Sequence, residues 1–235
     1  YLGTNYYISA PGSLRVIFTV EDYANEMNIS PRRVRAQIKD GKIRAHKIGN
    51  SWLIPDPPPT VLKARLPGPR LSARSFDQLA EYLDLRGKAL TPQQRFRSSQ
   101  RAKRIVDGGL PVALAYADRN GVSVGYFSAE KEDLEHLRRD SRILLTGVSH
   151  PSSGVATEMV DGYVPQEQFQ ALTDMYFLEE SPRGEGNVTL RRTDSLPARL
   201  GRLHILTDLA GDISSRSIDA AERILAEIRE DVPYA

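Results

Sequence analysis

The stretch FTVEDYANEMNISPRRVRAQIKDGKIRAHKIGNSWLIP, residues 18–55, carries the clearest local signals in the chain. Thr19 can cap a helix with Asp22 in its first turn, because a carboxylate at that end complements the helix dipole. Ser30 and Pro31 then suit the N-cap and the first position of a second helix. Two short helices joined by a tight turn form the helix-turn-helix pattern, which this stretch therefore predicts.

The second predicted helix concentrates positive charge. Val34 and Ile38 lie four residues apart and are expected to face inward. The polar side chains left for its outer faces are Arg32, Arg33, Arg35, Gln37 and Lys39. Arginine and lysine neutralise DNA phosphates, and arginine also binds guanine through two hydrogen bonds in the major groove. We therefore interpret this helix as a DNA recognition element and not as a merely solvated face, with Ser30 among its contacts.

A short β-hairpin is predicted after this helix. The segments AHKI and SWLI flank Gly49-Asn50, a two-residue loop suited to positive φ. A hairpin in this position is a wing, and its tip is expected to bring Lys47, Asn50 and Ser51 to the adjacent DNA backbone or minor groove. Trp52 is a lone tryptophan between alternating apolar residues, so it is expected to pack in the small core.

These residues resemble the excisionase-type, MerR-related winged helix-turn-helix family. The resemblance rests on the motifs TVEDYA at 19–24, ISPRRVR at 29–35, GKI at 41–43 and HKIGNSWLIP at 46–55. It implies binding of double-stranded DNA, with the second helix in the major groove and the wing beside it. The contacts that it implies are Arg32, Arg33, Arg35, Lys39, Lys47 and Asn50. Ala36 and Gln37 stand where the family often has an aromatic or basic residue.

The remaining chain divides by composition. Proline-rich sequence at 55–70 favours extended polyproline II and predicts a spacer between domains, more than a ligand for another protein's aromatic groove. Residues 1–14 show no period and do not begin with Met, which suggests a leader or tag remnant outside the fold. The expected divisions are this leader (1–14), a winged helix-turn-helix domain (15–54), a linker (55–71), a two-helix basic segment (72–109) and an acidic α+β partner-binding domain (110–235).

Beyond the linker the apolar pattern changes between helical and strand periods. The predicted helices cover 72–85, 91–107 (with a Thr91/Gln94 capping box and a stop at Gly108-Gly109), 129–139 (capped by Ser128), 166–178 and 216–230. The predicted strands cover 112–117, 122–127, 142–147, 158–164 and 187–192, the first two as a hairpin around Asp118-Arg119-Asn120-Gly121. The fold class is therefore α+β, with a small antiparallel or mixed sheet and helices on one side.

Charge is distributed unevenly along the chain. Residues 1–75 contain 12 Lys and Arg against 5 Asp and Glu, whereas residues 107–235 contain 13 against 22. A basic front and an acidic back suggest two kinds of partner, although chance segregation across solvated faces would give the same pattern. On the helix predicted from 92 to 107, Arg97, Arg101 and Arg104 form one cationic stripe. This stripe could extend the DNA contact surface or dock on the acidic back half, and the residues leave both alternatives open.

Short motifs in the remainder resemble the C-terminal part of actinobacterial AbiEi-type antitoxins. They are RLSARS at 70–75, LTPQQRFR at 90–97, LLTGVS at 144–149 and GNVTLR at 186–191. The resemblance implies an antitoxin that represses its own operon and binds a toxin, which could be nucleotidyltransferase-like. The acidic back half suits a basic partner, and it would suit any acidic sensor domain equally well. Self-association is the alternative to a different protein partner.

The sequence predicts a regulator and not an enzyme. The chain has no cysteine, and its four histidines (His46, His136, His150 and His204) show no metal-ligand spacing, so we expect no metal, no cofactor and no catalytic residues. A Ser149/His150 nucleophile–base pair is a minor alternative. No apolar run is long enough for a membrane helix and no signal-peptide core is evident, so we expect a cytoplasmic protein without membrane contact. The alternatives to an antitoxin are an excisionase-like recombination factor and a ligand-sensing repressor.

Overall fold

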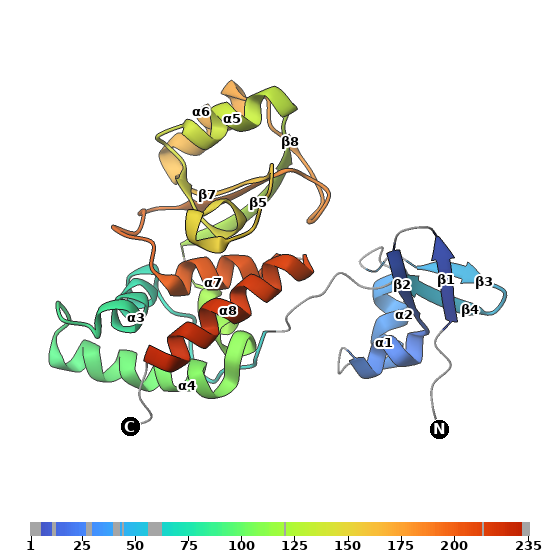
Figure 1. The fold of residues 1–235 in the computed structure, drawn as a ribbon, viewed down its shortest axis with the longest axis horizontal. Helices are drawn as coiled ribbons and strands as arrows, with labels where there is room; N and C mark the ends of the chain where they lie inside the picture. The colour runs from blue at the N-terminus through green and yellow to red at the C-terminus, as the bar shows by residue number, and fades with distance from the viewer. Residues whose placement is uncertain are drawn as a thin grey trace. The chain divides into compact units, whose positions relative to one another are not determined.

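The computed structural model describes residues 6–10, 13–26, 30–39, 43, 45–55, 63–119, 121–212 and 214–231. The chain divides into two compact units, Tyr1–Pro58 and Pro59–Ala235. Figure 1 shows that the first unit combines short helices with a small sheet, whereas the second contains a larger sheet between groups of helices. The fold is therefore of mixed α and β type in both units.

The first unit contains the predicted pair of helices and the predicted hairpin. Its elements are β1 (Tyr6–Ala10), β2 (Ser13–Phe18), α1 (Val20–Glu26), α2 (Pro31–Lys39), β3 (His46–Ile48) and β4 (Ser51–Pro55). The strands form an antiparallel sheet in the order β1-β2-β4-β3. The core of the unit comprises Val20, Tyr23, Ala24, Val34 and Ile54, with Trp52 packed against it. The prediction that Trp52 contributes to this core is confirmed.

Residues 1–14 belong in part to this sheet, which corrects their exclusion from the fold. β1 pairs with β2 from Tyr6 opposite Ile17 to Ala10 opposite Ser13, and β2 pairs with β4. A strand at the edge of a sheet is held by backbone hydrogen bonds, so it needs no strong side-chain period. The other residues of that stretch, 1–5 and 11–12, lie outside the described part of the chain.

The second unit has a mixed sheet. Its helices are α3 (Ala73–Leu85), α4 (Pro92–Ala117), α5 (Lys131–Arg139), α6 (Gln166–Met175), α7 (Arg202–Ala210) and α8 (Ser215–Asp231), with 3-10 turns η1 (Gly147–Ser149) and η2 (Pro151–Ser153). Its strands are β5 (Val122–Ser128), β6 (Leu144–Leu145), β7 (Val160–Pro165), β8 (Glu179–Glu180) and β9 (Val188–Thr193). They follow the order β6-β7-β9-β5-β8, with β7 and β9 parallel and the other pairs antiparallel.

Helices cover both faces of this sheet, so the prediction of helices on one side is wrong. α5 and α6 lie over one face, where their apolar residues form a core with the sheet. α7 lies on the other face and packs with α3, α4 and α8 in a second core (Figure 1). Every residue of β7 is buried, which requires cover on both sides. The region predicted as a separate two-helix basic segment, 72–109, supplies α3 and the first part of α4 to this second core.

Residues 112–117 are helical, so the predicted hairpin with 122–127 is wrong. The first helical segment does break at Gly109, which has φ +66° and ψ −156°, but a second segment follows at once and ends at Ala117. Leu110, Ala113 and Leu114 are buried at a spacing of three and four, which is helical. The run VALAYA fits a strand or a buried helix, and the cores around α7 and α8 decide for the helix.

Of the other predictions for the second unit, some are confirmed and some are wrong. The helix after Ser72 and the Thr91/Gln94 capping box are confirmed. Ser128 does not cap α5, whose N-cap is Glu130 without a side-chain hydrogen bond. The strand predicted over 142–147 shrinks to Leu144–Leu145, and neither α7 nor β8 was predicted.

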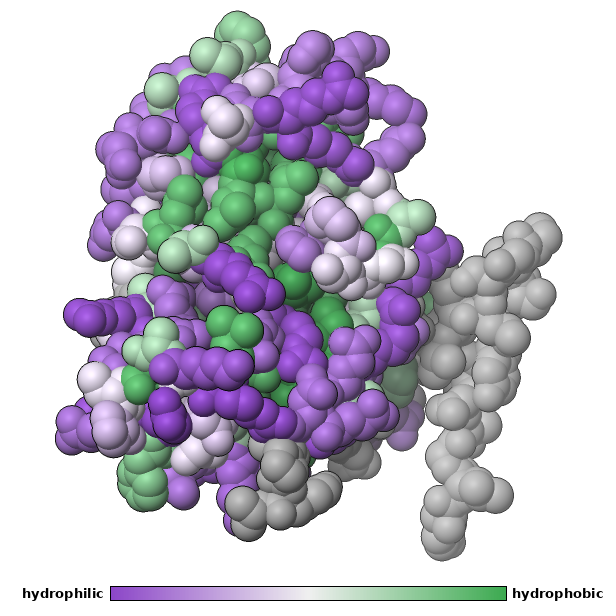
Figure 2. Space-filling model, turned by 60° about the vertical axis from the view of Figure 1, so that its left-hand side comes forward, coloured by the Kyte–Doolittle hydropathy of each residue, from purple (hydrophilic) through white to green (hydrophobic). Residues whose placement is uncertain are grey.

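The last residues of the predicted linker pack on the second unit. The backbone N–H of Ala64 donates to the carbonyl of Pro111 at 2.9 Å, and Leu66 and Leu71 lie against the helical core. Residues 63–71 are thus an extended segment of this unit, whereas 56–62 lie outside the described chain. Figure 2 shows hydrophilic side chains over most of one face, with hydrophobic side chains gathered toward its middle. None of the described helices combines the length and apolar character required to cross a membrane.

Candidate nucleic-acid interface

Side-chain caps define the starts of both helices in the first unit. The hydroxyl of Thr19 accepts from the backbone N–H of Asp22 at 3.1 Å and donates to its carboxylate at 2.8 Å. The hydroxyl of Ser30 accepts from the N–H of Arg33 at 3.3 Å, with Pro31 as the first residue of α2. Each cap satisfies a donor that the first helical turn leaves free. Both predicted caps are confirmed, and Ser30 is exposed.

The apolar side of α2 fixes which of its residues face outward. Val34 is fully buried and Ile38 is partly buried against the same core, as predicted. At 3.6 residues per turn, Arg32, Ala36 and Lys39 lie on the side opposite Val34. All three are exposed. The helix therefore presents two cations, separated by a small side chain, on its outer face.

The cations of α2 differ in their partners. Arg32, Arg33 and Lys39 are exposed and form no ion pair with any described residue. Arg35 instead contacts Glu21 of α1, with 2.6 Å between Nη2 and Oε1 and both side chains more than half exposed. This pair joins the two helices and partly neutralises one predicted DNA contact. The side chain of Gln37 lies outside the described part of the chain.

The hairpin places the other predicted contacts at its tip. β3 and β4 pair with Ile48 opposite Ser51, which leaves Gly49 and Asn50 as a two-residue loop. Gly49 has φ +60°, a conformation that type II′ hairpin turns require at their first loop position. Lys47, Asn50 and Ser51 are all exposed. The ammonium of Lys47 lies 6.0 Å from the centre of the Trp52 ring, within the range of a cation–π contact.

The stripe on α4 belongs to the second unit and is available to solvent. Arg97 and Arg104 are exposed, Arg101 is partly exposed, and no described carboxylate pairs with any of them. Arg95, by contrast, donates to the backbone carbonyl of Gly87. The sequence left open whether this stripe docks on the acidic half of the chain. Among the described residues, no ion pair supports that alternative.

The serine–histidine alternative fails on geometry. Nδ1 of His150 accepts from the backbone N–H of Ser152 at 3.1 Å, which makes the histidine a helix cap, and burial lowers its pKa. The hydroxyl of Ser149 donates to the carbonyl of Met159 and accepts from the N–H of Asp161, both at 2.8 Å. Each side chain is thus engaged with the backbone, and neither activates the other.

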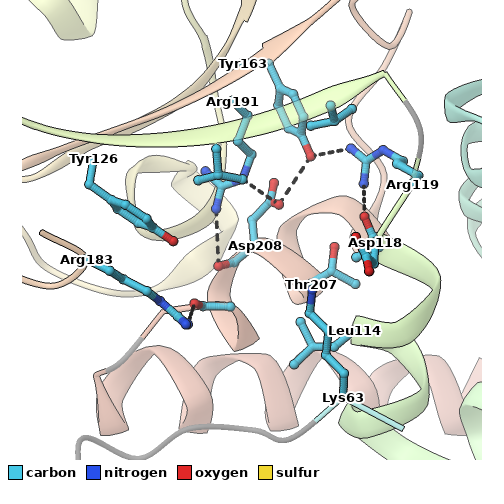
Figure 3. Close-up of a pocket in the computed structure, with 14 residues that line it drawn as sticks. Lys63, Leu114, Asp118, Arg119, Tyr126, Tyr163, Arg183, Arg191, Thr207 and Asp208 are labelled. Atoms are coloured by element: carbon cyan, nitrogen blue, oxygen red, sulfur yellow. Dashed lines mark hydrogen bonds and ion pairs between the residues drawn. The ribbon is translucent and has the colours of Figure 1, made fainter. Parts of the chain in front are cut away.

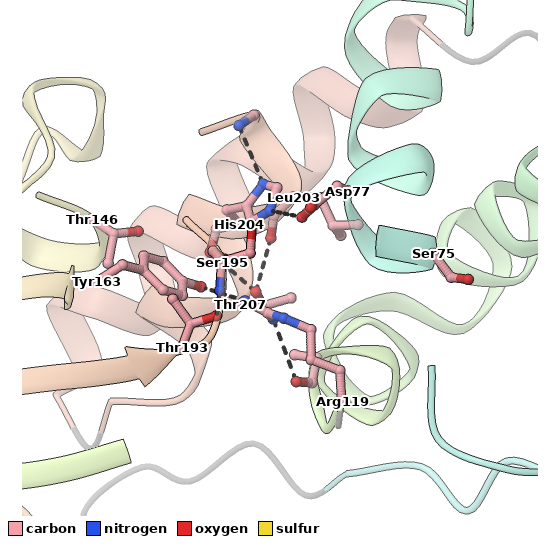
Figure 4. A network of polar contacts seen from close by, with 12 residues as sticks. Ser75, Asp77, Arg119, Thr146, Tyr163, Thr193, Ser195, Leu203, His204 and Thr207 are labelled. Atoms are coloured by element: carbon pink, nitrogen blue, oxygen red, sulfur yellow. Dashed lines mark hydrogen bonds and ion pairs between the residues drawn. The ribbon is translucent and has the colours of Figure 1, made fainter. Parts of the chain in front are cut away.

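His204 is also engaged on both ring nitrogens (Figure 4). Nδ1 accepts from the N–H of Gly201 at 3.3 Å, and Nε2 lies 3.0 Å from the carboxylate of Asp77. The imidazole is 1% exposed and packs edge-on against Phe76 and Tyr163. These contacts describe a structural histidine that joins α7 to α3. No group of three or more metal-ligating side chains occurs among the described residues.

Sequence reasoning missed a buried cluster of charges between the sheet and α7. Arg191 of β9 contacts Asp161 of β7 and Asp208 of α7, and its side chain is 8% exposed. One signal was available, because two adjacent arginines in a central strand must point to opposite faces. Arg192 does lie over the ring of Phe169 in α6, which places Arg191 on the α7 side.

One family model matches part of the first unit. Residues 17–55 match a helix-turn-helix domain. The matched segment contains both helices and the hairpin, under a fifth of the chain, and such domains are characteristic of sequence-specific DNA-binding regulators. No curated protein and no solved structure matches the chain. The DNA-binding interpretation of this segment therefore has independent support, whereas the similarity of the remainder to AbiEi-type antitoxins has no counterpart in these comparisons.

Proposed function

We propose that this protein is a transcriptional regulator that reads DNA with α2 in the major groove and uses the β3–β4 hairpin as a wing. The observation that carries the proposal is the outer face of α2. Arg32 and Lys39 are exposed there, opposite the buried Val34, and no described carboxylate neutralises them. Exposed cations on a helix, without an ion pair to any described residue, can release counterions from DNA phosphates and donate to base edges.

The contacts divide by chemistry. Arg32 lies in the first turn of α2, the part of a recognition helix that contacts base edges. Arg33 flanks this surface and Lys39 extends it. Gln37 is a further proposed contact on the evidence of its sequence position alone. Ser30 lies at the N-terminus of α2, where backbone N–H groups favour a phosphate. In the hairpin, Lys47, Asn50 and Ser51 are suited to the DNA backbone, which positions a protein without reading sequence.

Duplex binding tests this assignment. A preferred duplex would be selected from a random pool with the full chain, and affinity would then be measured by fluorescence anisotropy against salt concentration. Arg32→Ala should weaken the preferred duplex by about 1–3 kcal/mol relative to unrelated duplexes if the guanidinium binds a base. Lys47→Ala should weaken all duplexes equally and reduce the salt slope by about 0.9.

The control is Arg216→Ala, which removes an exposed cation from α8 in the second unit. It should leave affinity and salt slope unchanged. An Arg32→Ala protein that binds and discriminates like the parent would remove α2 from the interface. Absence of duplex binding by the full chain at low ionic strength would overturn the proposed function.

The stripe on α4 is proposed as a further DNA contact. Arg97, Arg101 and Arg104 carry no described partner, so they can bind phosphates if DNA reaches them. The triple alanine variant should reduce the salt slope by up to about 2.7, because each phosphate that is no longer neutralised reduces it by about 0.9. An unchanged slope would confine DNA binding to the first unit.

At a finer level, we propose an antitoxin-type repressor of its own operon, acting in the cytoplasm, whose second unit binds a protein partner. The resemblance of this part to AbiEi-type antitoxins and its net negative charge over 107–235 support the idea, since a basic toxin would be electrostatically complementary. Self-association through the same unit is the alternative. An excisionase-like factor is disfavoured because Pro59–Ala235 has extensive cores of its own.

The neighbouring reading frame tests the finer proposal. A nucleotidyltransferase-like product should form a stoichiometric complex with the co-expressed full chain and lose its toxicity. An adjacent integrase gene, or a neighbouring product that is neither bound nor neutralised, would reject the antitoxin role. DNA binding by α2 would stand in either case.

A further inference from the structure

The second unit contains a cavity of about 190 Å³ beside its buried charges. It lies where the end of α4, strands β5 and β9 and helix α7 converge (Figure 3). Its polar wall includes Lys63, Arg119, Tyr126, Arg183, Arg191 and Asp208. Val124 and Leu114 supply apolar surface to the same wall. The cavity is thus a mixed pocket in which cations outnumber carboxylates.

The carboxylates near this cavity are already engaged. Asp208 accepts from Thr146 at 2.7 Å and from the Tyr163 hydroxyl at 3.2 Å, and it lies 2.8 Å from Nε of Arg191. Arg191 also contacts Asp161, so one guanidinium serves two carboxylates, and the Tyr163 hydroxyl bridges Asp208 to the guanidinium of Arg119. Burial, together with the Asp208 charge, raises the pKa of Tyr163 well above its ordinary value, which keeps the phenol protonated.

The other carboxylate of the wall, Asp118, contacts Arg70 at 3.5 Å. Asp118 is thus engaged at the surface, and Asp208 reaches Arg119 only through the Tyr163 hydroxyl. A cation of this pocket without a carboxylate in direct contact keeps N–H donors for a bound anion.

Arg119 is that cation. It is 6% exposed, and its guanidinium donates to the Tyr163 hydroxyl at 2.7 Å and to the Ala117 carbonyl at 3.4 Å. No described carboxylate lies within ion-pair distance of it, and its guanidinium carbon sits 4.2 Å from the centre of the Phe76 ring. A buried charge is costly unless it is paired, and a guanidinium offers five N–H donors. The site therefore holds a positioned cation whose hydrogen-bonding capacity is only partly used.

The rim adds charge and hydrogen-bonding groups. Lys63 and Arg183 are exposed lining residues, and Arg183 donates to the carbonyl of Gly211 at the end of α7. The phenol of Tyr126 points toward the space between Arg183 and Asp208 in Figure 3 and makes no hydrogen bond with a described residue. Two exposed cations at the mouth and one fixed cation inside would attract an anion and orient it.

We propose that this cavity binds a small organic molecule through an oxyanion, a carboxylate or phosphate group held by Arg119 with Lys63 and Arg183 at the entrance. The planar guanidinium matches both groups, because each presents oxygens that accept parallel N–H bonds. The volume is below the roughly 300–1,000 Å³ of pockets for drug-sized ligands, so the ligand is small. Such a site would allow the second unit to sense a small anionic ligand, in addition to the protein binding proposed for it above.

Isothermal titration of the full chain with sodium phosphate and with sodium succinate, at an ionic strength balanced with chloride, tests the proposal. At least one probe should bind saturably with one site per chain. Arg119→Gln should weaken that binding by about tenfold or more, because a charged hydrogen-bond donor is removed. The two probes also separate phosphate ligands from carboxylate ligands.

Val124→Trp provides a second variant that keeps every charged residue of the pocket in place. Val124 is 47% exposed and lines the cavity, so the indole should fill it and suppress binding. The matched control is Ser123→Trp, at an exposed neighbouring position of β5 whose side chain points to the opposite face. Arg32→Ala should leave the titration unchanged, which separates this site from anion binding by α2. The proposal would be overturned if neither probe binds saturably. It would also be overturned if the Arg119→Gln and Val124→Trp variants bind the probe as tightly as the unaltered protein does.

Discussion

The arginines of the helix-turn-helix unit and those in the interior of the second unit meet different partners. In the helix-turn-helix unit, Arg32 and Arg33 are exposed and have no described ion-pair partner, and Arg35 has one in a solvent-exposed pair. In the second unit, Arg191 contacts two largely buried carboxylates, and Arg202 pairs with the largely buried Asp84 as well as with the exposed Asp231. Residue type alone therefore does not distinguish an arginine that is available to DNA from one that holds a fold together. Burial together with a partner within the fold does.

The largest expected effect is the loss of a partnered arginine. Arg191→Leu would leave the Asp161 carboxylate buried without its cation, so the free energy of unfolding should fall by about 3–5 kcal/mol, measured by urea denaturation. Arg192→Leu is the matched control on the same strand, because Arg192 is more exposed and its contacts are with Ser123 and the Phe169 ring. Its cost should be about 1 kcal/mol or less. Equal losses in the two variants would contradict the contrast between buried partnered arginines and exposed ones.

A smaller effect is expected where a pair lies near the surface of the second unit. The side-chain hydrogen bond from Arg142 lowers the pKa of Asp140 from 3.8 to about 2 against the opposing effect of burial, and Tyr176 also donates to this carboxylate. A lowered pKa means that the stabilisation is complete above about pH 4 and is lost as pH falls toward 2. Asp140→Asn should therefore cost about 1–2 kcal/mol at pH 7.

The pH dependence of the same pair provides the check. The difference in unfolding free energy between the parent and Asp140→Asn should shrink as the pH is lowered from 4 to 2, followed by chemical denaturation at each pH. Asp133→Asn, which removes a carboxylate from α5 for which no ion pair is described, is a suitable control. A difference that stays constant over this range would show that Asp140 does not titrate with folding.

The smallest effect should come from the exposed pair of the first unit. Glu21→Ala removes the partner of Arg35, and an exposed pair of this kind contributes about 0.2–1 kcal/mol to stability. Duplex affinity should rise slightly, because an arginine is released and a negative charge near the proposed DNA surface is removed. Glu26, at the other end of α1, offers a control of equal charge through Glu26→Ala. A fall in affinity would instead assign the pair the role of orienting α2.

Local features of the fold were predictable because short-range interactions specify them. The caps at Thr19, Ser30 and Thr91 follow from a side chain and a backbone group three residues apart. The 49–50 loop follows from a glycine that takes positive φ. The exposure of Arg32 was predictable from helical spacing, since burying Val34 turns Arg32 outward. The exposure of Lys47 was predictable from its place beside the hairpin loop.

Predictions failed where a local pattern had two solutions or where the partner was distant. VALAYA could form a strand or a buried helix, and only its burial against the neighbouring helices selects the helix. α7 is buried almost all round, so it lacks the amphipathic period that would have revealed it. The salt bridge of Arg202 with Asp84 spans 118 positions in the chain, which no local pattern records.

The amino-acid sequence by itself determined where the two helices and the hairpin of the first unit lie and which face of α2 is exposed. The helix caps, the spacing of apolar residues and Gly49 all act over only a few neighbouring residues. Tertiary structure alone decided that β1 and β2 extend the sheet of the first unit, that α7 closes the second face of the larger sheet, and that Arg191 contacts two carboxylates while Arg119 contacts none of the described ones directly. Such outcomes depend on which distant surfaces are packed together. The free energy of burying a charge is set by those neighbours and not by the residues beside it in the sequence.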